Sequence, residues 1–158
     1  MISPKIIFYK KIIDKRGYFS EIFVNKKLKK NFVQENLVFN KKKNTFRGLH
    51  YQQKPFDQGK LITVLRGSII DFVCEIKKKN NKFNIKKFKL SDKDSKWLWV
   101  PSNYAHGYLT CENNTLILYK VTNHYYPKYE KKINVFDENL FSVMDLNKSK
   151  IIVSNKDA

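Results

Sequence analysis

Cysteine, histidine and arginine are scarce in this chain of 158 residues, which has two cysteines and three histidines. Cys74 and Cys111 are far apart, form no CxxC motif and lack the spacing of metal ligands. These features exclude a disulfide framework and a cysteine-based zinc site. We expect two reduced thiols in a cytoplasmic protein.

The shortage of arginine limits the partners that the basic charge suggests. The formal net charge is +18, but only Arg16, Arg47 and Arg66 are arginine, so lysine supplies the other 29 of 32 basic side chains. Proteins that read nucleic acids depend on arginine for bidentate contacts to bases and phosphates. The lysine excess is typical of a solvated surface, and nucleic acid is not expected as a partner.

Long hydrophobic runs are also missing. Lys5, Lys10 and Lys11 interrupt the apolar residues near the N-terminus, which argues against a signal peptide. No stretch approaches the roughly 20 apolar residues that span a membrane. The sequence predicts a protein of the cytoplasm with no membrane contact, and its length and hydrophobic content of 42% predict one domain over residues 1–158.

Short β-branched and aromatic runs dominate what is present. Residues 59–77 contain two such runs, separated by Arg66-Gly67-Ser68 as in a hairpin. Further runs cover residues 82–91, 96–101 and 115–126, bounded by Asn, Ser, Asp or Pro. This spacing predicts an all-β sandwich or barrel. A helix is expected only over Asn25–Asn31, with a helical turn near Glu138–Phe141.

Histidine is the side chain that titrates near neutral pH, so the three histidines are the first candidates for chemistry. We expect His50 and His106 to lie in turns, because glycines stand beside them, and His124 to lie at the end of a strand. Alternation along residues 115–126 places Tyr119 and Tyr125 on the same face, together with Ile117, Val121 and Asn123. A lone histidine is usually a hydrogen-bonded structural residue.

Two classes of chemistry fit the pattern poorly. Tyr51 and Gln52 follow His50, so there is no HxH pair, and no Cys/His cluster completes a metal site. No GxSxG motif and no cysteine lies near a histidine, which argues against a serine or cysteine nucleophile. Metal-free acid–base chemistry next to a carbonyl remains, for which histidine, tyrosine, lysine and a carboxylate suffice.

Four motifs together resemble one known family. FRGLHYQ (46–52), QGKLITVLRG (58–67), VPSNYAHGY (100–108) and LILYKVTNHYY (116–126) follow the order and spacing of the dTDP-4-dehydrorhamnose 3,5-epimerase family. The resemblance extends from DKRGYFSE (14–21) to SNKD (154–157). It implies a cupin-like jelly roll with small peripheral helices and no metal or other cofactor. It also implies a homodimer that acts on a nucleoside-diphosphate 4-keto-6-deoxy sugar.

The resemblance also implies roles for individual residues. His50 is expected to be the general base, paired with Asp157, and Tyr119 the general acid on the opposite side of the sugar ring. Lys60 and His106 are expected to contact the sugar. The remaining substrate-binding positions are Arg16, Glu21, Gln34, Asn36, Arg47, Tyr125, Glu130 and Lys156.

Physical chemistry supports these roles. A 4-keto group acidifies the neighbouring C–H bonds, but their pKa stays roughly ten units above that of His50, so the enolate oxygen needs a cation such as Lys60. Inversion requires a proton from the other face, which the neutral phenol of Tyr119 can give. Guanidinium groups pair well with phosphate oxygens, which gives the scarce arginines a role at the diphosphate.

Two alternatives stay open on the sequence. A nucleotide-sugar 3,4-ketoisomerase of the same fold would shuttle a proton between adjacent carbons, but that branch resembles RGxHxH and Gln52 replaces the second histidine here. A non-catalytic barrel that binds a sugar or nucleic acid would keep the lysines without needing His50 and Tyr119 together.

Overall fold

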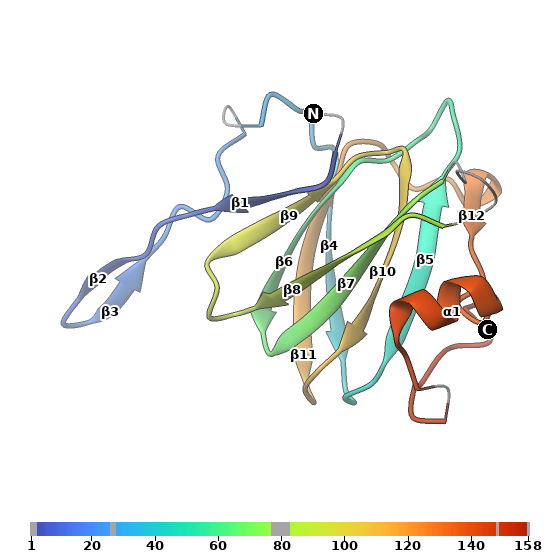
Figure 1. Cartoon of the computed structure of the whole chain (residues 1–158). Coiled ribbons are helices and arrows are strands. Elements are labelled where there is room, and N and C mark those ends of the chain that lie inside the picture. Colours follow the sequence, from blue (N-terminus) through green and yellow to red (C-terminus); the bar gives the residue numbers. More distant parts are fainter. Residues whose placement is uncertain (1–2, 26–27, 77–82, 148, 158) are drawn as a thin grey trace.

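Two antiparallel sheets face each other in the computed structural model, which describes residues 3–25, 28–76, 83–147 and 149–157 (Figure 1). The first sheet has the strand order β1-β9-β6-β11-β4 and the second has the order β12-β5-β10-β7-β8. The strands of the first sheet are β1 (Lys5–Phe8), β9 (Lys96–Val100), β6 (Lys60–Arg66), β11 (Thr115–Val121) and β4 (Gln34–Asn40). Those of the second are β12 (Glu130–Lys132), β5 (Phe46–Gln52), β10 (Tyr104–Thr110), β7 (Ser68–Glu75) and β8 (Ile85–Ser91). This is the all-β jelly-roll architecture that the sequence predicts.

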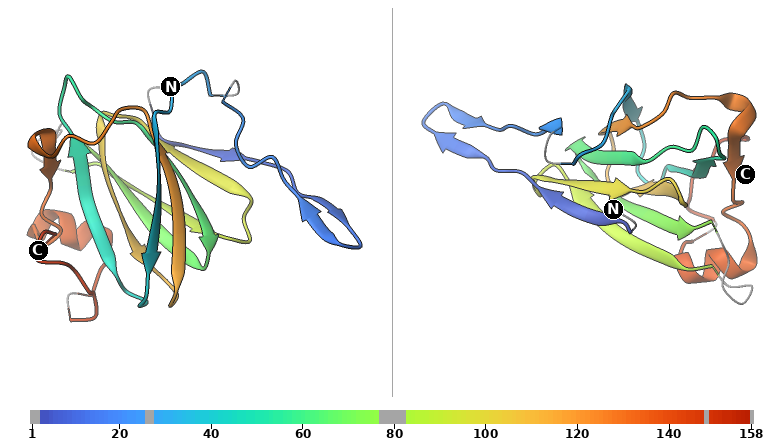
Figure 2. Two further views of the ribbon diagram at one scale, coloured as in Figure 1. Left: turned by 180° about the vertical axis from the view of Figure 1, so that it is seen from behind. Right: turned by 90° about the horizontal axis from the view of Figure 1, so that it is seen from above.

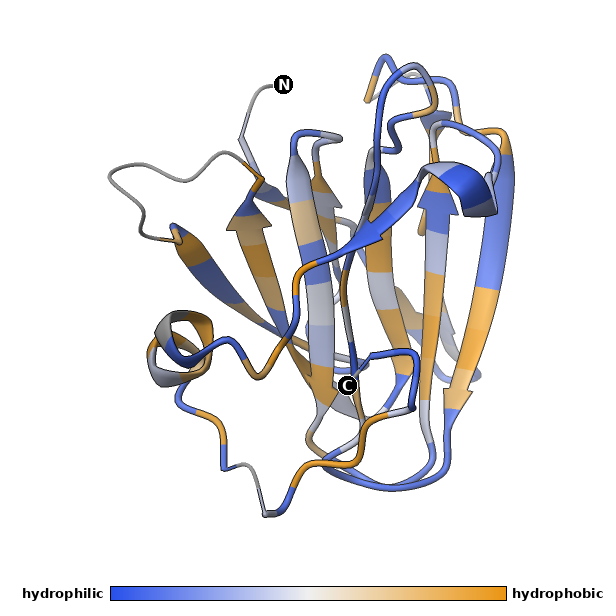
Figure 3. Ribbon diagram, turned by 90° about the vertical axis from the view of Figure 1, so that its right-hand side faces the viewer, coloured by the Kyte–Doolittle hydropathy of each residue, from blue (hydrophilic) through white to orange (hydrophobic). Residues whose placement is uncertain are grey.

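The strands form where the β-branched and aromatic runs predict them. Residues 59–77 give β6 and β7, joined at Gly67, whose φ of +82° suits the hairpin turn. The other three runs give β8, β9 and β11. Hydropathy changes in short bands along the strands, as expected when alternate side chains face the interior (Figure 3).

Apolar side chains fill the space between the sheets and cover both outer faces. The inner cluster joins strands of both sheets and includes Ile62, Val73 and Ile117. Phe46 and Leu140 belong to a second cluster, in which the helix α1 (Glu138–Met144) packs on the outside of the second sheet. A third cluster, formed by Leu28, Leu61, Trp97 and Trp99, covers the outside of the first sheet. The inner cluster leaves part of the interior open to polar side chains.

A two-stranded hairpin projects from the body of the molecule. Its strands, β2 (Ile12–Asp14) and β3 (Gly17–Phe19), pair only with each other, and they extend away from the side that carries α1 and the C-terminus (Figures 1 and 2). Ile13 is 78% exposed and Phe19 is 64% exposed. We call residues 12–19 the arm.

The histidines lie differently from the prediction. His50 is in β5 and His106 is in β10, where the two are cross-strand partners. The prediction of turns was wrong, because the neighbouring Gly48 and Gly107 allow the backbones of β5 and β10 to approach each other closely. His124 lies in the loop after β11, close to the predicted strand end.

The helix prediction was right at one place only. Glu138–Phe141 begins α1, which continues to Met144. Residues 26–27 of the segment Asn25–Asn31 lie outside the described part of the chain, and residues 28–31 form a turn and irregular structure. Leu28 is buried there against Trp97 and Trp99. No helix in the described ranges is long and apolar enough to cross a membrane.

Candidate active site

A cavity of about 370 Å³ opens between the two sheets. Strands β4, β6 and β11 of the first sheet, strands β5, β10 and β12 of the second, and the C-terminal segment all contribute to its wall. The lining residues are Gln34, Asn36, Val38, Arg47, His50, Gln58, Lys60, Ile62, His106, Tyr108, Ile117, Tyr119, Val121, Tyr125, Glu130, Ser154, Lys156 and Asp157. Eleven of these are positions that the sequence predicts as site residues.

A β-bulge explains how β5 delivers two of its side chains to the cavity. Positions three apart on a regular strand face opposite sides, yet Arg47 and His50 both line the cavity. The register slips here, because His106 pairs with His50 whereas Tyr108 pairs with Arg47, so β5 carries one extra residue. Gly48 makes the bulge possible through its φ of +120°.

His50 contacts the carboxylate of Asp157. Their atoms Nε2 and Oδ1 are 2.8 Å apart, and Asp157 is only 4% exposed. The distance is that of an ion pair, although the ring N–H is not aligned with the oxygen well enough for a hydrogen bond. Burial lowers the pKa of His50 and the charge of Asp157 opposes that shift, so the ring is a neutral base in contact with a carboxylate.

Lys60, from β6 of the first sheet, and His106, from β10 of the second sheet, bring two further polar groups to the cavity. The Nζ atom of Lys60 donates to the carbonyl oxygen of His50 at 3.5 Å. Burial lowers the pKa of Lys60 to about 8, and the negative charges of Asp71 and Glu130 oppose the shift. His106 is largely buried, and burial holds its pKa well below the usual value, so the imidazole is neutral.

Tyr119 enters the cavity from β11 of the first sheet, whereas His50 enters from the second sheet. It lies in register with Asn36 on one side and Ile62 on the other. Burial raises the pKa of Tyr119, which keeps its phenol protonated at neutral pH. A proton donor and a neutral base therefore line one cavity from different sheets.

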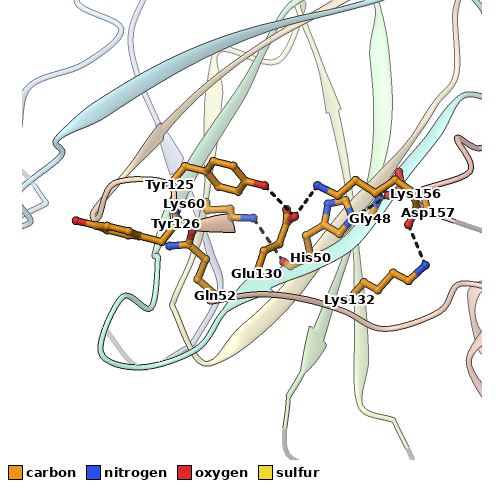
Figure 4. A network of polar contacts seen from close by, with 10 residues as sticks. All are labelled: Gly48, His50, Gln52, Lys60, Tyr125, Tyr126, Glu130, Lys132, Lys156 and Asp157. Atoms are coloured by element: carbon orange, nitrogen blue, oxygen red, sulfur yellow. Dashed lines mark hydrogen bonds and ion pairs between the residues drawn. The ribbon is translucent and has the colours of Figure 1, made fainter. Parts of the chain in front are cut away.

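Glu130 gathers a network at one end of the cavity (Figure 4). Its Oε2 accepts hydrogen bonds from the hydroxyl of Tyr125 at 3.0 Å and from Nζ of Lys156 at 2.5 Å. Burial of Glu130 is outweighed by these two bonds, so its pKa is lowered and it stays ionised. Lys132 donates to the carbonyl oxygen of Lys156 at 2.9 Å, which ties the C-terminal segment to β12 just before Asp157.

The polar side chains from β4 and β5 are also anchored. Arg47 donates through Nε to Oδ1 of Asn40 at 2.9 Å, and Tyr108 donates to the same oxygen at 3.3 Å. Gln34 donates to Asn36 at 2.8 Å. These contacts hold an arginine and two amides at the cavity wall, where they can bind a polar, anionic ligand.

Arg16, Glu21 and Arg66, which the sequence also predicts for substrate binding, lie outside the cavity of their own chain. Arg16 pairs with Asp14 in the turn of the arm, 83% exposed, and Glu21 follows the arm outside the cavity. Within one chain, neither reaches the predicted substrate site. Arg66, which the sequence also offers for the diphosphate, donates to the backbone of Asn114 at the far end of β6, so that expectation was wrong.

Sequence reasoning missed three residues at or behind the site. Gln58 and Tyr108 line the cavity and stand within the motifs that carry the family resemblance, but were given no role. Asp71 lies directly behind His106 and is fully buried. An aspartate at an inward position of an apolar strand, between Ile69 and Val73, was the signal that could have identified it. Across the described ranges, no three His, Cys, Asp or Glu side chains form a group that could hold a metal ion.

Comparison with known sequences matches this geometry to one family. The family model for dTDP-4-dehydrorhamnose 3,5-epimerase matches residues 3–158. The epimerase of Sinorhizobium fredii is 33% identical over 160 residues, which cover 98% of this chain and 82% of the relative. The epimerase of Salmonella typhimurium is 36% identical, with 87% of this chain and 76% of the relative covered.

Solved structures of epimerases are also similar to this chain. The dTDP-4-dehydrorhamnose 3,5-epimerase of Bacillus anthracis, determined with TDP and PPi bound, has a TM-score of 0.90 at 30% identity and covers 98% of this chain and 90% of its own. The epimerase of Legionella pneumophila in complex with dTDP-4-keto-L-rhamnose has a TM-score of 0.85 at 31% identity, covering 98% and 84%. The fold, the cavity and the sequence similarity all lead to the same conclusion: the chain belongs to the dTDP-4-dehydrorhamnose 3,5-epimerase family.

Proposed function

We propose that this protein inverts carbon 3, carbon 5 or both in a nucleoside-diphosphate 4-keto-6-deoxy sugar, and that its substrate is dTDP-4-dehydro-6-deoxyglucose, converted to dTDP-4-dehydrorhamnose. One observation carries the proposal. His50, in contact with Asp157, and Tyr119 line one cavity from different sheets, together with the cation Lys60. Family membership supports the choice of sugar.

His50 acts as the base that removes a proton next to the keto group. Asp157 faces Nε2 at 2.8 Å, which leaves Nδ1 to take the proton while the carboxylate stabilises the imidazolium that forms. Negative charge then develops on the carbonyl oxygen, where Lys60 supplies a cation and His106 a neutral donor. Burial lowers the pKa of His50 and of His106, which leaves both rings neutral, and Lys60, with a pKa of about 8, still carries its proton at neutral pH.

Tyr119 returns a proton to the other face of the carbon. If His50 returned it, the starting configuration would be restored, so inversion needs a second donor. A protonated phenol on the opposite sheet meets that need. Arg47, Gln34, Asn36, Tyr125 and Lys156 are proposed to hold the nucleotide and diphosphate.

We also propose a homodimer, because the arm exposes a large apolar surface. Ile12, Ile13, Tyr18 and Phe19 are each more than 60% exposed, and a two-stranded hairpin is marginally stable alone in water. A second copy that covers the arm would bury this surface. The partner's cavity would then receive Arg16 and Glu21, which explains why these two predicted site residues lie outside the cavity of their own chain.

The test is proton NMR of dTDP-4-keto-6-deoxyglucose incubated with the protein in deuterated water. We expect deuterium at carbons 3 and 5, or at one of them, accompanied by inversion. Movement of the keto group would indicate a 3,4-ketoisomerase. Binding without exchange at any carbon would indicate a non-catalytic barrel and contradict the proposal.

No metal or nicotinamide is required for this chemistry, because the substrate already contains the carbonyl that acidifies its C–H bonds. Turnover is therefore expected to survive dialysis against EDTA and to need no added cofactor. Activity that disappears in EDTA and returns with a divalent ion would show that a metal takes part. The cytoplasmic location stays a prediction from the sequence.

A further inference from the structure

Gln52, the last residue of β5, is a buried polar side chain that has no part in the chemistry above. It is 3% exposed, and it replaces the second histidine of the RGxHxH pattern. A buried amide lowers stability unless its N–H groups and its oxygen are hydrogen-bonded. The partners of Gln52 therefore indicate what it does.

Three backbone groups bond to the side chain of Gln52. Its Nε2 donates to the carbonyl oxygen of Phe56 at 2.6 Å and to that of His124 at 3.1 Å. Its Oε1 accepts the N–H of Tyr126 at 2.6 Å (Figure 4). These partners also fix the orientation of the amide, because the opposite orientation would face its oxygen toward two carbonyls and its nitrogen toward an N–H.

Two of these partners lie on either side of Tyr125 in the chain. The carbonyl of His124 belongs to the peptide bond before Tyr125, and the N–H of Tyr126 belongs to the peptide bond after it. The third partner, Phe56, packs its ring against that of Tyr126, with 4.0 Å between the ring centroids. Gln52 therefore fixes the backbone from which the side chain of Tyr125 extends.

Tyr125 extends from this backbone to the cavity. It lines the cavity and is 46% exposed, and its hydroxyl donates to Glu130 at 3.0 Å. Glu130 is in turn the register partner of Gln52 across β12 and β5. Tyr125 is thus held at its backbone by Gln52 and at its hydroxyl by Glu130, while its ring stays open to a ligand.

We infer that Gln52 is a positioning residue for substrate binding: it binds the peptide groups on both sides of Tyr125 and so places the Tyr125 side chain at the cavity wall. The inference rests on the function proposed above, in which Tyr125 helps to hold the nucleotide and diphosphate. A histidine at position 52 could not replace the glutamine, because a neutral imidazole has one donor and one acceptor, whereas three backbone groups are bonded here.

The variant Gln52→Met tests the inference through the affinity for dTDP, which isothermal titration calorimetry measures without turnover. Methionine has a similar length but makes none of the three bonds, so Tyr125 loses its fixed position. Loss of a well-placed aromatic contact weakens binding by about fivefold or more, and we expect Kd to rise by that factor. KM should rise with it and kcat should change less, because His50 and Tyr119 carry out the proton transfers.

A double-mutant cycle separates this role from a general loss of structure. If Gln52 acts through Tyr125, the Kd of the double variant Gln52→Met/Tyr125→Ala should equal that of Tyr125→Ala within about twofold. Effects that multiply in the double variant would overturn the inference, as would an unchanged Kd in Gln52→Met alone. A wild-type protein that does not bind dTDP would count against the proposed function instead.

Thr115→Val is the matched control. Thr115 is fully buried, its hydroxyl donates to the carbonyl oxygen of Glu112 at 2.8 Å, and it does not line the cavity. Both variants remove a buried bond from a side chain to the backbone, so chemical denaturation should show a loss of stability in each. The affinity for dTDP should fall in Gln52→Met alone. An equal fall in Thr115→Val would assign the effect to stability and overturn the inference.

A measurement on the unaltered, ligand-free protein does not depend on a variant folding well. Nitrogen-15 NMR can follow the side-chain amide of Gln52, which donates to two carbonyl oxygens, and the backbone N–H of Tyr126. We expect the protons of both groups to exchange slowly with solvent. Fast exchange at the Gln52 amide would show that it does not hold the backbone around Tyr125, and would overturn the inference even where dTDP binds normally.

Discussion

At the scale of single residues, His50 and Tyr119 differ in the face of the sugar that each can reach, since they come from different sheets. With His50→Ala the enolate should rarely form, so neither deuterium exchange nor product is expected above background. With Tyr119→Phe the ring still packs and the base is intact, so exchange without matching inversion is expected at the carbon deprotonated first. Proton NMR in deuterated water measures both quantities.

Tyr51→Phe is the control for loss of a phenol. Tyr51 lies next to His50 on β5, but its side chain packs on the outer face of the sheet. Exchange and inversion in that variant should match the wild type. If Tyr119→Phe inverted the sugar at the wild-type rate, the acid would have to be another group, such as Tyr125 or a bound water.

Gly48 gives a second prediction at this scale. A Cβ added at Gly48 would lie 2.5 Å from the Cα of Gly107, and the φ of +120° disfavours any other residue. Gly48→Ala should therefore lower the free energy of unfolding by about 2 kcal/mol or more. It should also reduce turnover, because the bulge that points Arg47 and His50 into the cavity must shift.

Gly67→Ala separates these two effects. Gly67 has a φ of +82° and a close neighbour in Thr115, but it lies in a hairpin turn away from the cavity. Chemical denaturation should show a loss of stability in both variants, and kinetics a loss of turnover in Gly48→Ala alone. Equal turnover in Gly48→Ala and the wild type would show that the bulge does not position the base.

At the scale of elements, the C-terminal segment places the carboxylate of Asp157 against the ring of His50. A parallel bridge between Thr45 and Ile152 and the bond from Lys132 to Lys156 fix the segment before Asp157 meets His50. Removing residues 157–158 should lower kcat by about a hundredfold or more, with a smaller effect on KM, because the imidazolium loses its counter-charge. Steady-state kinetics measure both constants.

Removal of residue 158 alone is the control for shortening the chain, and it should leave kcat unchanged. If the variant without Asp157 turned over as fast as the wild type, this carboxylate would not take part in proton transfer. A large rise in KM with constant kcat would instead assign the segment to substrate binding.

Strand positions were predictable from the sequence, but the location of the histidines in them was not. Runs rich in Val, Ile and aromatic residues form strands because they suit a half-buried pleated surface. Gly48 and Gly107 interrupt two such runs and therefore looked like turn residues. Their actual role is long-range: the two glycines let β5 and β10 approach closely, and no local pattern reveals which strand will lie opposite.

The same limit applies to the site. Of the five residues that alternation assigns to one face, four line the cavity: Ile117, Tyr119, Val121 and Tyr125. Asn123 does not, because β11 ends at Val121 and the alternation ends with it. The placing of Lys60, His50 and Asp157 around one cavity came from resemblance to a family, because their distance along the chain gives no geometric information. Asp71 was missed, although its alternation with the apolar residues Ile69 and Val73 was a signal that it faces inward.

At the scale of the whole molecule, the exposed apolar residues of the arm provide a test of the proposed homodimer. Ile12 and Phe19 are cross-strand partners on the arm and are each about two-thirds exposed. Changing both to lysine should abolish a dimer of two 18.9-kDa chains, as measured by sedimentation equilibrium. Val143→Lys on α1, on the other side of the molecule, is the matched control and should remain dimeric.

Exchange of the arm between copies also predicts complementation between inactive variants. If Arg16 acts in the partner's cavity, a chain with Arg16→Ala has an inactive arm but an intact cavity. A chain with His50→Ala has an intact arm but an inactive cavity. A mixed dimer then contains one site with both an intact cavity and an intact arm. Mixing equal amounts after dissociation and reassociation should restore about one quarter of wild-type turnover, because half of the random dimers are mixed and each has one working site. No recovery from two variants that form mixed dimers would show that Arg16 does not serve the partner's site.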